Sequence, residues 1–186
     1  VGHSLEVIES VETLSGGGPP DVRELVLVQG AELLELVGIA ATIEEGRQRI
    51  AKVLDNGHAR TLFEVMVRAQ GGDPAFVRQP SRLGSAPCVD PFRAPQTGRL
   101  GFGDVRRVGL AVAALGGGRV HVTDVIDPHV GLVWHKQAGE EVRAGETLCE
   151  IHHRNGKGLA ECQAHLTATL SYDAPVAPLV RCSLRV

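Results

Sequence analysis

Eight histidines are candidates for binding a metal ion or for transferring protons near neutral pH. A helix that binds zinc places two histidines four residues apart, and no two of the eight have that spacing. His152 and His153 are adjacent, so in a strand their side chains would point to opposite faces. The sequence therefore predicts no histidine metal site. The eight are His3, His58, His121, His129, His135, His152, His153 and His165.

Nucleophilic chemistry has little support from residue spacing. The four cysteines, Cys88, Cys149, Cys162 and Cys182, include no C-x-x-C pair, so neither a zinc knuckle nor a redox pair is indicated. They are typical of reduced thiols in a cytosolic protein. The chain contains no Gly-x-Ser-x-Gly elbow. We therefore assign no catalytic residue from the pattern.

Two glycine triplets, residues 16–18 and 116–118, are candidates for binding a phosphate through free backbone N–H groups. A phosphate loop also needs a strand before it and usually a Lys or Ser/Thr at its far end. Both triplets instead follow a predicted helix, and Pro19 and Pro20 after the first one lack N–H groups. We therefore expect a turn between helices at the first triplet and a helix C-cap with a loop at the second.

A glycine spacing in the second half of the chain indicates short strands. Gly139 and Gly145 are six residues apart, and the apolar residues three places beyond each have the same spacing. This pattern predicts a compact β hairpin and is similar to the barrel-sandwich hybrid of lipoyl and biotinyl domains. Such carriers need a lysine at a hairpin tip, between Asp and Ala or between two Met. Neither Lys136 nor Lys157 has these neighbours, so a carrier function is not supported.

The elements that must position any site begin with a helix at the N-terminus. Apolar residues from Val7 to Leu14 recur at steps of three and four, which places them on one face. Glu6, Glu9 and Glu12 fall on the other side. The pattern predicts an amphipathic helix with a charged, solvated face.

Three more helices are predicted before residue 70. Asp21, with Glu24 three residues on, is typical of a capping box and would start a helix from Val22 to about Ala40. Its residues 33–37 are apolar almost all round, which predicts burial.

A second capping box at residues 42–45 starts the third helix, and Gly57 ends it in the left-handed C′ position. The fourth helix runs from about Ala59 to Ala69. Its predicted buried stripe is Leu62, Val65, Met66 and Ala69.

A proline-rich stretch separates two halves of the chain. We expect residues 1–82 to form a helical part, 83–96 a linker with little helix or strand potential, and 97–186 a C-terminal α+β domain. The fold class is therefore α+β. The elements predicted in the last part are a strand at about 97–102, a helix at 105–115 capped by Asp104, a strand from Arg119, a helix at about 155–170 and a closing strand at 175–186.

Composition restricts the possible partners. The chain has 186 residues, enough for one good domain or two small ones, and a net charge of -3 with both signs interspersed. Aromatic residues make up 3%, so neither a nucleic-acid groove nor a base-stacking platform is indicated. No apolar run approaches the roughly 20 residues of a membrane helix, and no signal peptide is visible. We expect no nucleic-acid or membrane partner and a cytoplasmic location.

Several segments together resemble thymidine phosphorylase and related pyrimidine-nucleoside phosphorylases. The stretch Gly-His-Ser-Leu-Glu-Val-Ile-Glu from Gly2, followed by the break Gly-Gly-Pro-Pro-Asp, is similar to the segment after that family's active-site strands. The other matching segments are 54–57, 63–66 and 69–71 in the family's middle region, and 109–119, 127–131 and 139–151 in its C-terminal domain. Their combination in this order is specific, and the resemblance covers nearly the whole chain.

The resemblance implies that the chain is the C-terminal part of a larger pentosyltransferase. Such an enzyme uses inorganic phosphate to split thymidine, or another pyrimidine nucleoside, reversibly into the base and a pentose 1-phosphate, in pyrimidine salvage. It needs no organic cofactor and is typically a homodimer with a helical lobe and an α/β lobe. The family's phosphate loop and base-holding residues would precede Val1. We therefore assign no catalytic or substrate-binding residue and expect this chain alone to be inactive.

The resemblance carries over one functional position. Some members bind a structural monovalent cation, potassium, near the hinge through backbone carbonyls and one glutamate, which Glu9 matches. Carbonyl and carboxylate oxygens suit a hard cation, although the carbonyl donors would lie just before Val1. The alternative hypothesis is a free-standing, non-enzymatic module that docks on a partner through its helical half. A phosphate loop encoded upstream of Val1 would favour the enzyme, and a start codon there would favour the module.

Overall fold

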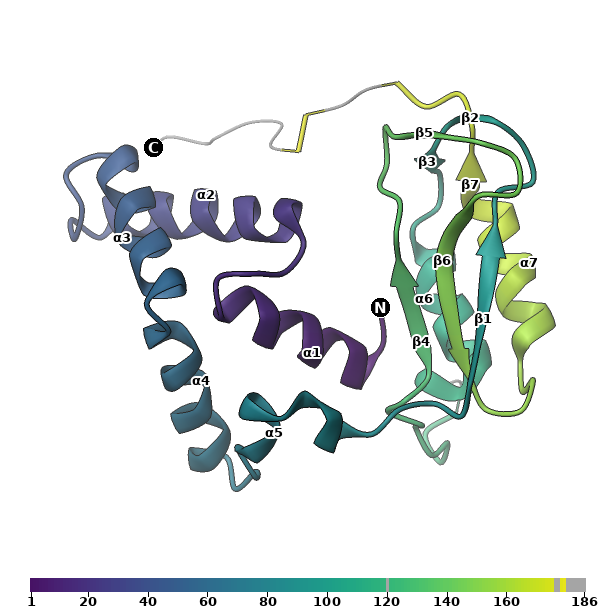
Figure 1. Cartoon of the computed structure of the whole chain (residues 1–186), viewed down its shortest axis with the longest axis horizontal. Coiled ribbons are helices and arrows are strands. Elements are labelled where there is room, and N and C mark those ends of the chain that lie inside the picture. Colours follow the sequence, from purple (N-terminus) through teal and green to yellow (C-terminus); the bar gives the residue numbers. More distant parts are fainter. Residues whose placement is uncertain (120, 176–177, 180–186) are drawn as a thin grey trace. The chain divides into compact units, whose positions relative to one another are not determined.

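The computed structural model describes residues 1–119, 121–175 and 178–179 and confirms the predicted α+β class. The chain forms two compact units. We call the first the sheet unit; it contains Val1–Glu6 together with Leu83–Ala177. The second, the helical unit, is built on Val7–Arg82 (Figure 1). None of the described helices combines the length and apolar character needed to cross a membrane.

Helices make up the regular structure of residues 3–83. They are α1 (His3–Leu14), α2 (Pro20–Leu36), α3 (Ile43–Asp55), α4 (His58–Ala69), the short α5 (Ala75–Arg78) and a 3₁₀ turn (Pro80–Leu83). α2 lies against α3, and α3 contacts α4. The two longer helices approach closely where the buried Ala31 meets Gly46, since a Cβ on Gly46 would lie 2.8 Å from the Ala31 Cα.

Local capping signals set the ends of α3 as predicted. The Thr42 side chain accepts a hydrogen bond from the Glu45 N–H at 3.2 Å, and the Glu45 carboxylate accepts one from the Ala41 N–H at 2.8 Å. Gly57 follows the helix with φ 78°, in the left-handed region. The box predicted at Asp21 was wrong, because α2 already begins at Pro20 after Pro19 without a side-chain cap. Proline suits the first helical position because no N–H is needed there.

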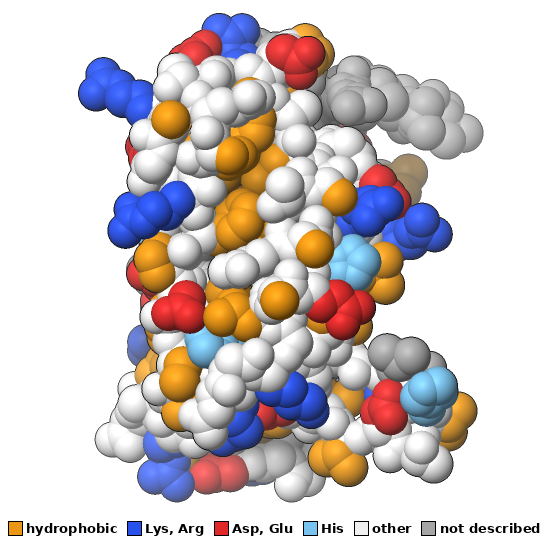
Figure 2. Space-filling view, turned by 90° about the vertical axis from the view of Figure 1, so that its right-hand side faces the viewer, with side chains coloured by type: hydrophobic (Ala, Val, Ile, Leu, Met, Phe, Trp, Pro, Cys, Tyr) orange, Lys and Arg blue, Asp and Glu red, His pale blue; other side chains and the backbone are white. Residues whose placement is uncertain are grey.

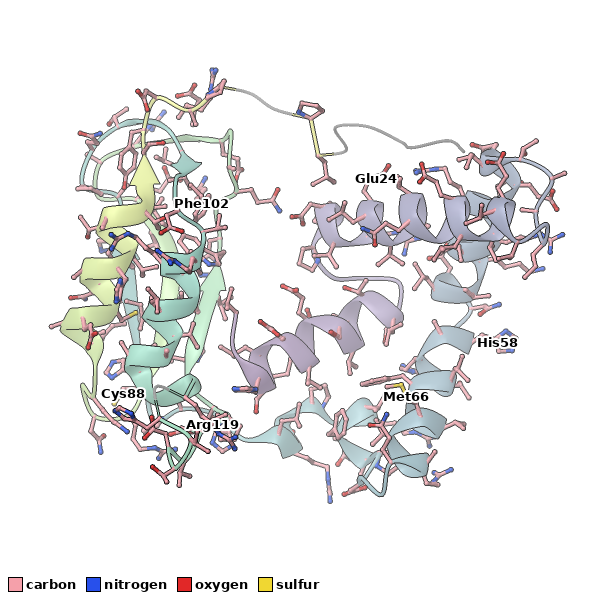
Figure 3. All side chains as sticks on the ribbon, turned by 180° about the vertical axis from the view of Figure 1, so that it is seen from behind. Glu24, His58, Met66, Cys88, Phe102 and Arg119 are labelled. Carbon is pink, nitrogen blue, oxygen red and sulfur yellow. The ribbon has the colours of Figure 1, made fainter. Side chains whose placement is uncertain are left out.

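The predicted burial of two apolar stretches in the helical unit was also wrong. Leu33, Leu36 and Val37 are 61%, 75% and 63% exposed. On α4, Leu62 and Met66 are 69% and 46% exposed, and Val65 and Ala69 are exposed as well (Met66 is labelled in Figure 3). Periodicity identifies an apolar helix face but does not say what covers it. In the part of the chain that the structure describes, these side chains remain open to solvent.

The sheet unit is built on a three-stranded antiparallel sheet in the order β1-β6-β4. These strands are Cys88–Arg93, Thr147–His153 and Gly131–Trp134, respectively. Two short pairs join β2 (Gly98–Arg99) to β5 (Glu141–Val142) and β3 (Gly101–Phe102) to β7 (Leu170–Ser171). α6 (Arg106–Val112), which runs into a wider turn at Ala113–Gly117, packs against α7 (Leu159–Thr169).

The core of the sheet unit lies between one face of the sheet and these two helices. Leu132, Cys149 and Ile151 from the strands form one buried cluster with Leu115 and Leu166. Phe102 and Trp134 pack against this cluster with their rings edge to face and 4.9 Å between centroids. On the face of the molecule shown in Figure 2, further apolar side chains form a broken column flanked by charged ones.

Several predictions for the second half need correction. β1 lies within residues 83–96, which were expected to be a linker without a strand. His121 and Val122 lie in a turn, not in the predicted strand from Arg119, while Val120 itself lies outside the described residues. The closing strand predicted at 175–186 and Cys182 also fall largely or wholly outside them. The expected strand at 97–102 is present as β2 and β3, and α7 matches the expected helix.

Candidate functional site

Backbone groups of both glycine triplets are engaged at the ends of the helices that precede them. At the first, the Gly16 N–H bonds the Thr13 carbonyl at 3.1 Å and the Gly17 N–H bonds the Glu12 carbonyl at 3.0 Å. Both N–H groups are therefore used to end α1.

At the second triplet the carbonyl groups carry the contacts. The Gly116 carbonyl accepts from the Asp127 N–H at 2.9 Å, and the Gly117 carbonyl lies 2.8 Å from the His3 ring Nε2. Carbonyl oxygens at a helix C-terminus carry partial negative charge and repel an anion. The predicted turn between helices at the first triplet and the predicted helix end with a loop at the second are both confirmed.

The two lysines considered as carriers are not presented at a free tip. Lys136 pairs with Glu146 at 2.8 Å, and this hydrogen bond raises the pKa of the lysine and lowers that of the carboxyl. Lys157 lies beside the second glycine triplet, because a Cβ on Gly116 would be 3.3 Å from its Nζ. Both positions are consistent with structural roles.

His153 is a buried histidine of the sheet unit that contacts the half-exposed Asp90. The His153 side chain is 5% exposed, and its Nε2 lies 3.0 Å from the Asp90 carboxylate. Its Nδ1 accepts a hydrogen bond from the Gly156 N–H at 2.9 Å. Because Nδ1 is an acceptor, the ring proton is on Nε2 and is donated to Asp90. The ring therefore ties β6 to β1 through Asp90 and holds the turn between β6 and α7 through Gly156.

His152 lies on the opposite face of the same strand, as the adjacent positions predicted. Both of its ring nitrogens are buried without a hydrogen-bond partner among the described residues. Burial lowers the pKa of this imidazole, against a smaller opposing effect of Glu150, whose carboxylate is 3.9 Å away. His135 approaches the same Glu150 at 3.5 Å. His152, Glu150 and His135 thus lie in a row, but His152 makes no hydrogen bond to Glu150 and no nucleophile lies beside them in the described structure.

A shallow hollow of about 580 Å³ opens beside β5. It is lined by Thr97, by the segment 141–144 and by Glu146, so its charged groups are mainly carboxylates. The Thr97 hydroxyl already accepts a hydrogen bond from the Ala144 N–H at 3.0 Å. These groups do not resemble a site for a phosphate or another anion.

Glu9 lies on α1 with an exposed side chain. Its backbone carbonyl accepts a hydrogen bond from the Thr13 hydroxyl at 3.0 Å, and no bond of its carboxylate is found within the described residues. No three His, Cys, Asp or Glu side chains come together there or elsewhere in the described parts of the chain as a metal-binding group. The carboxylate is thus available for a cation but has no partner ligands among these side chains, so its role stays a prediction.

Sequence reasoning missed the pair between the buried His153 and Asp90. Its histidine was placed correctly on the face opposite to His152, but Asp90 fell within the expected linker. The alternation of exposed Val89, Pro91 and Arg93 with more buried residues in 88–93 appears only in the structure, because the residue types there do not alternate between apolar and polar.

Comparison with known proteins identifies the origin of this architecture. The Pyrimidine nucleoside phosphorylase C-terminal domain family matches residues 100–173, which contain β3, α6, β4, β6 and α7. A pyrimidine-nucleoside phosphorylase of Staphylococcus aureus is 36% identical over 152 residues, which is 82% of this chain and 35% of the relative. Those of Staphylococcus haemolyticus and Staphylococcus epidermidis are 37% identical over the same length and shares. The chain thus spans about a third of the length of these relatives. It belongs to the pyrimidine-nucleoside phosphorylase family, and residues 100–173 are that family's C-terminal domain.

Proposed function

We propose that the chain is the C-terminal part of an enzyme that splits thymidine reversibly with inorganic phosphate into thymine and 2-deoxyribose 1-phosphate. The observation that carries this proposal is the 36–37% identity to phosphorylases over 152 residues. Phosphate would attack the anomeric carbon while the bond to the base breaks, through an oxocarbenium-like transition state. Positioning and stabilisation of the leaving base would supply the catalysis. We place this pentosyl transfer in cytoplasmic pyrimidine salvage.

The chain's own contribution in this proposal is structural. Its glycine triplets use their hydrogen-bonding groups to end helices, and the buried His153 is engaged on both ring nitrogens. These engaged groups are not available as donors for phosphate. We therefore expect the purified 186-residue chain to release no thymine from thymidine in the presence of phosphate.

A chimera tests the proposal directly. The Staphylococcus epidermidis relative, cut where its similarity to this chain begins, would be joined to residues 1–186. We expect phosphate-dependent cleavage of thymidine or uridine by the chimera and none by the cut relative or by this chain alone. Measuring both nucleosides decides the base preference. A folded chimera, checked by Trp134 fluorescence, that cleaves neither nucleoside would refute the proposal.

We also propose that Glu9 contributes its carboxylate to a structural potassium ion in the longer enzyme. Its exposure on α1 and its unengaged carboxylate support this role. In the chimera, potassium chloride should raise the melting temperature relative to choline chloride, and Glu9→Gln should remove most of that increase. Glu12→Gln, on the same exposed side of α1, is the matched control. An equal response to potassium in all three proteins would contradict the assignment.

The exposed apolar side chains of the helical unit can be explained by either of two assembly states. In the first they are covered within a phosphorylase homodimer, and in the second the chain is a non-enzymatic docking module. Sedimentation of the chimera and of the chain alone discriminates between them. An active dimeric chimera supports the enzyme, whereas an inactive chimera with a stable monomeric chain supports the module.

A further inference from the structure

The outer edge of β4 carries an unfinished strand pairing. β4 is an edge of the sheet and has β6 as its only strand partner in the described residues. On its other side, the Val1 ammonium donates to the Leu132 carbonyl at 2.6 Å, and the Leu132 N–H donates to the Val1 carbonyl at 2.7 Å. Two residues that exchange both backbone bonds form the hydrogen-bonded pair of an antiparallel ladder. Figure 1 shows the N-terminus beside β4.

The following residues confirm the direction of this pairing. The Ser4 N–H donates to the Pro128 carbonyl at 3.0 Å, so the chain after Val1 runs against the direction of β4. Glycines allow the close approach in between. A Cβ on Gly2 would lie 2.6 Å from the Val130 carbonyl oxygen, and one on Gly131 would collide with the Val1 carbonyl oxygen. Any residues before Val1 that keep this direction would therefore run alongside Val133 and Trp134.

The alternation of backbone hydrogen bonds along β4 identifies the next residue whose N–H and carbonyl point away from β6. The His135 N–H bonds the Leu148 carbonyl of β6 at 2.9 Å, and β4 pairs with β6 in unbroken register. Backbone groups of successive strand residues point to alternate sides, so those of Val133 also face β6. The Trp134 N–H and carbonyl then face the open side, as those of Leu132 do toward Val1.

We propose that the outer edge of β4 is the docking site for an extended segment directly preceding Val1 in a longer chain. The residue two positions before Val1 exchanges both backbone hydrogen bonds with Trp134. The occupant is indicated by continuity with the Val1–Leu132 pair and by relatives about three times as long as the matched part. Addition of a strand to a free sheet edge is a general mode of recognition.

The environment of Trp134 specifies the type of residue at that position. Directly opposed residues in a ladder share a face, and Leu132 and Trp134 lie on the face covered by the core. The residue opposite Trp134 should therefore be apolar, whereas the one immediately before Val1 lies on the other face, beside Val133. This inference rests on backbone geometry and does not depend on phosphorolysis.

Hydrogen exchange at Trp134 tests the docking site in three chains. One begins at Val1, one carries Ser-Ile-Ser before Val1, and one carries Ser-Pro-Ser there. We expect exchange of the Trp134 amide to slow about tenfold with Ser-Ile-Ser and less with Ser-Pro-Ser, whose proline cannot donate to the Trp134 carbonyl. The Val133 amide, which faces β6, is the internal reference and should not change.

Equal exchange of the Trp134 amide in all three chains would overturn the proposal. So would protection in the unextended chain that appears only as its concentration rises, since this would assign the edge to a second copy. Sedimentation of the unextended chain at a low and a high concentration would show whether such a dimer forms. None of the extensions alters a buried residue, so the comparison does not depend on whether a variant folds.

Discussion

Gly158 at the start of α7 offers a sharp test of how the sheet unit is held together. Its φ is 66°, in the left-handed region. A Cβ built at this position would collide with the Ala114 carbonyl oxygen and lie 2.5 Å from the carbon of the same group. The Leu115 nitrogen would be 3.1 Å away. All three are backbone atoms where α6 runs into its final turn, so no side-chain rotation can relieve the contact.

The expected loss for Gly158→Ala has two parts. A non-glycine residue in the left-handed region costs about 1–2 kcal/mol, and forcing an extra methyl group into a packed site costs about 1–3 kcal/mol. The free energy of unfolding should therefore fall by about 2–5 kcal/mol. Gly156→Ala is the matched control, since Gly156 also has a positive φ, 79°, but has open space around its Cβ position. Gly156→Ala should therefore lose only the backbone contribution of about 1–2 kcal/mol.

Urea unfolding followed by the fluorescence of Trp134, the single tryptophan, measures both variants in the sheet unit. The difference between them isolates the contact with the Ala114 carbonyl. At roughly 2–4 °C per kcal/mol for a chain of this size, thermal melting should resolve it as well. A Gly158→Ala protein no less stable than Gly156→Ala would refute the close packing of α7 on the end of α6.

Three further outcomes follow from other contacts. Thr42→Ala should destabilise the helical unit by about 1 kcal/mol because the α3 cap is lost, and urea unfolding followed by circular dichroism would show no change if the cap were dispensable. The hydrogen bond from Arg154 holds the pKa of Asp127 below its ordinary 3.8, so the folded state binds fewer protons and Asp127 stabilises it above about pH 4. That contribution is lost as the pH falls through the folded-state pKa. The stability advantage over Asp127→Asn should therefore shrink on acidification, and a constant difference would contradict this. Burial raises the pKa of Cys149 and Cys162 to about 12, so Ellman's reagent should modify them only as the sheet unit unfolds; rapid reaction of either in the native protein would disprove their burial.

Short-range signals were sufficient to predict much of the helical unit. The capping box at Thr42 and the left-handed Gly57 depend on residues within one turn, and both act as predicted. The exposure of Leu62 and Met66 could not be predicted in this way. Whether an apolar face is covered depends on the packing of distant segments, which periodicity within one helix does not contain.

The strand β1 shows why proline misled the prediction. Pro91 lies in the middle of β1, opposite Glu150. Since Leu148 of β6 bonds β4, the backbone groups of Glu150 also face β4, and those of Cys149 and Ile151 face β1. The backbone nitrogen of Pro91, which has no N–H, therefore faces away from the sheet. An edge strand tolerates a proline at such a position. Asp90, and with it the pairing of this carboxylate with the buried His153, was missed for the same reason.

Of the candidate site, the sequence supplied only Glu9, and that came from resemblance. The structure adds its exposure and its free carboxylate but brings no other carboxylate or imidazole group to it within the described chain. Cation sites assembled from backbone carbonyls have no residue signature, because every residue carries such an oxygen. A site of this kind is therefore recognisable only once its complete set of donors is present.

The pairing of Val1 with Leu132 has a consequence for synthesis on the ribosome. The sheet unit takes its first six residues from the start of the chain and the rest from Leu83 onward, so its edge cannot close until β4 has been made. At about 5–20 residues per second, that interval lasts roughly 6–26 s. During this time α2, α3 and α4 can fold from local contacts, while the first turn of α1 waits for its partners. Among the described strand pairings of the sheet unit, the Val1–Leu132 pairing joins the residues farthest apart in sequence, so it waits longest and leaves the Val1 segment open to chaperones or proteases during that time.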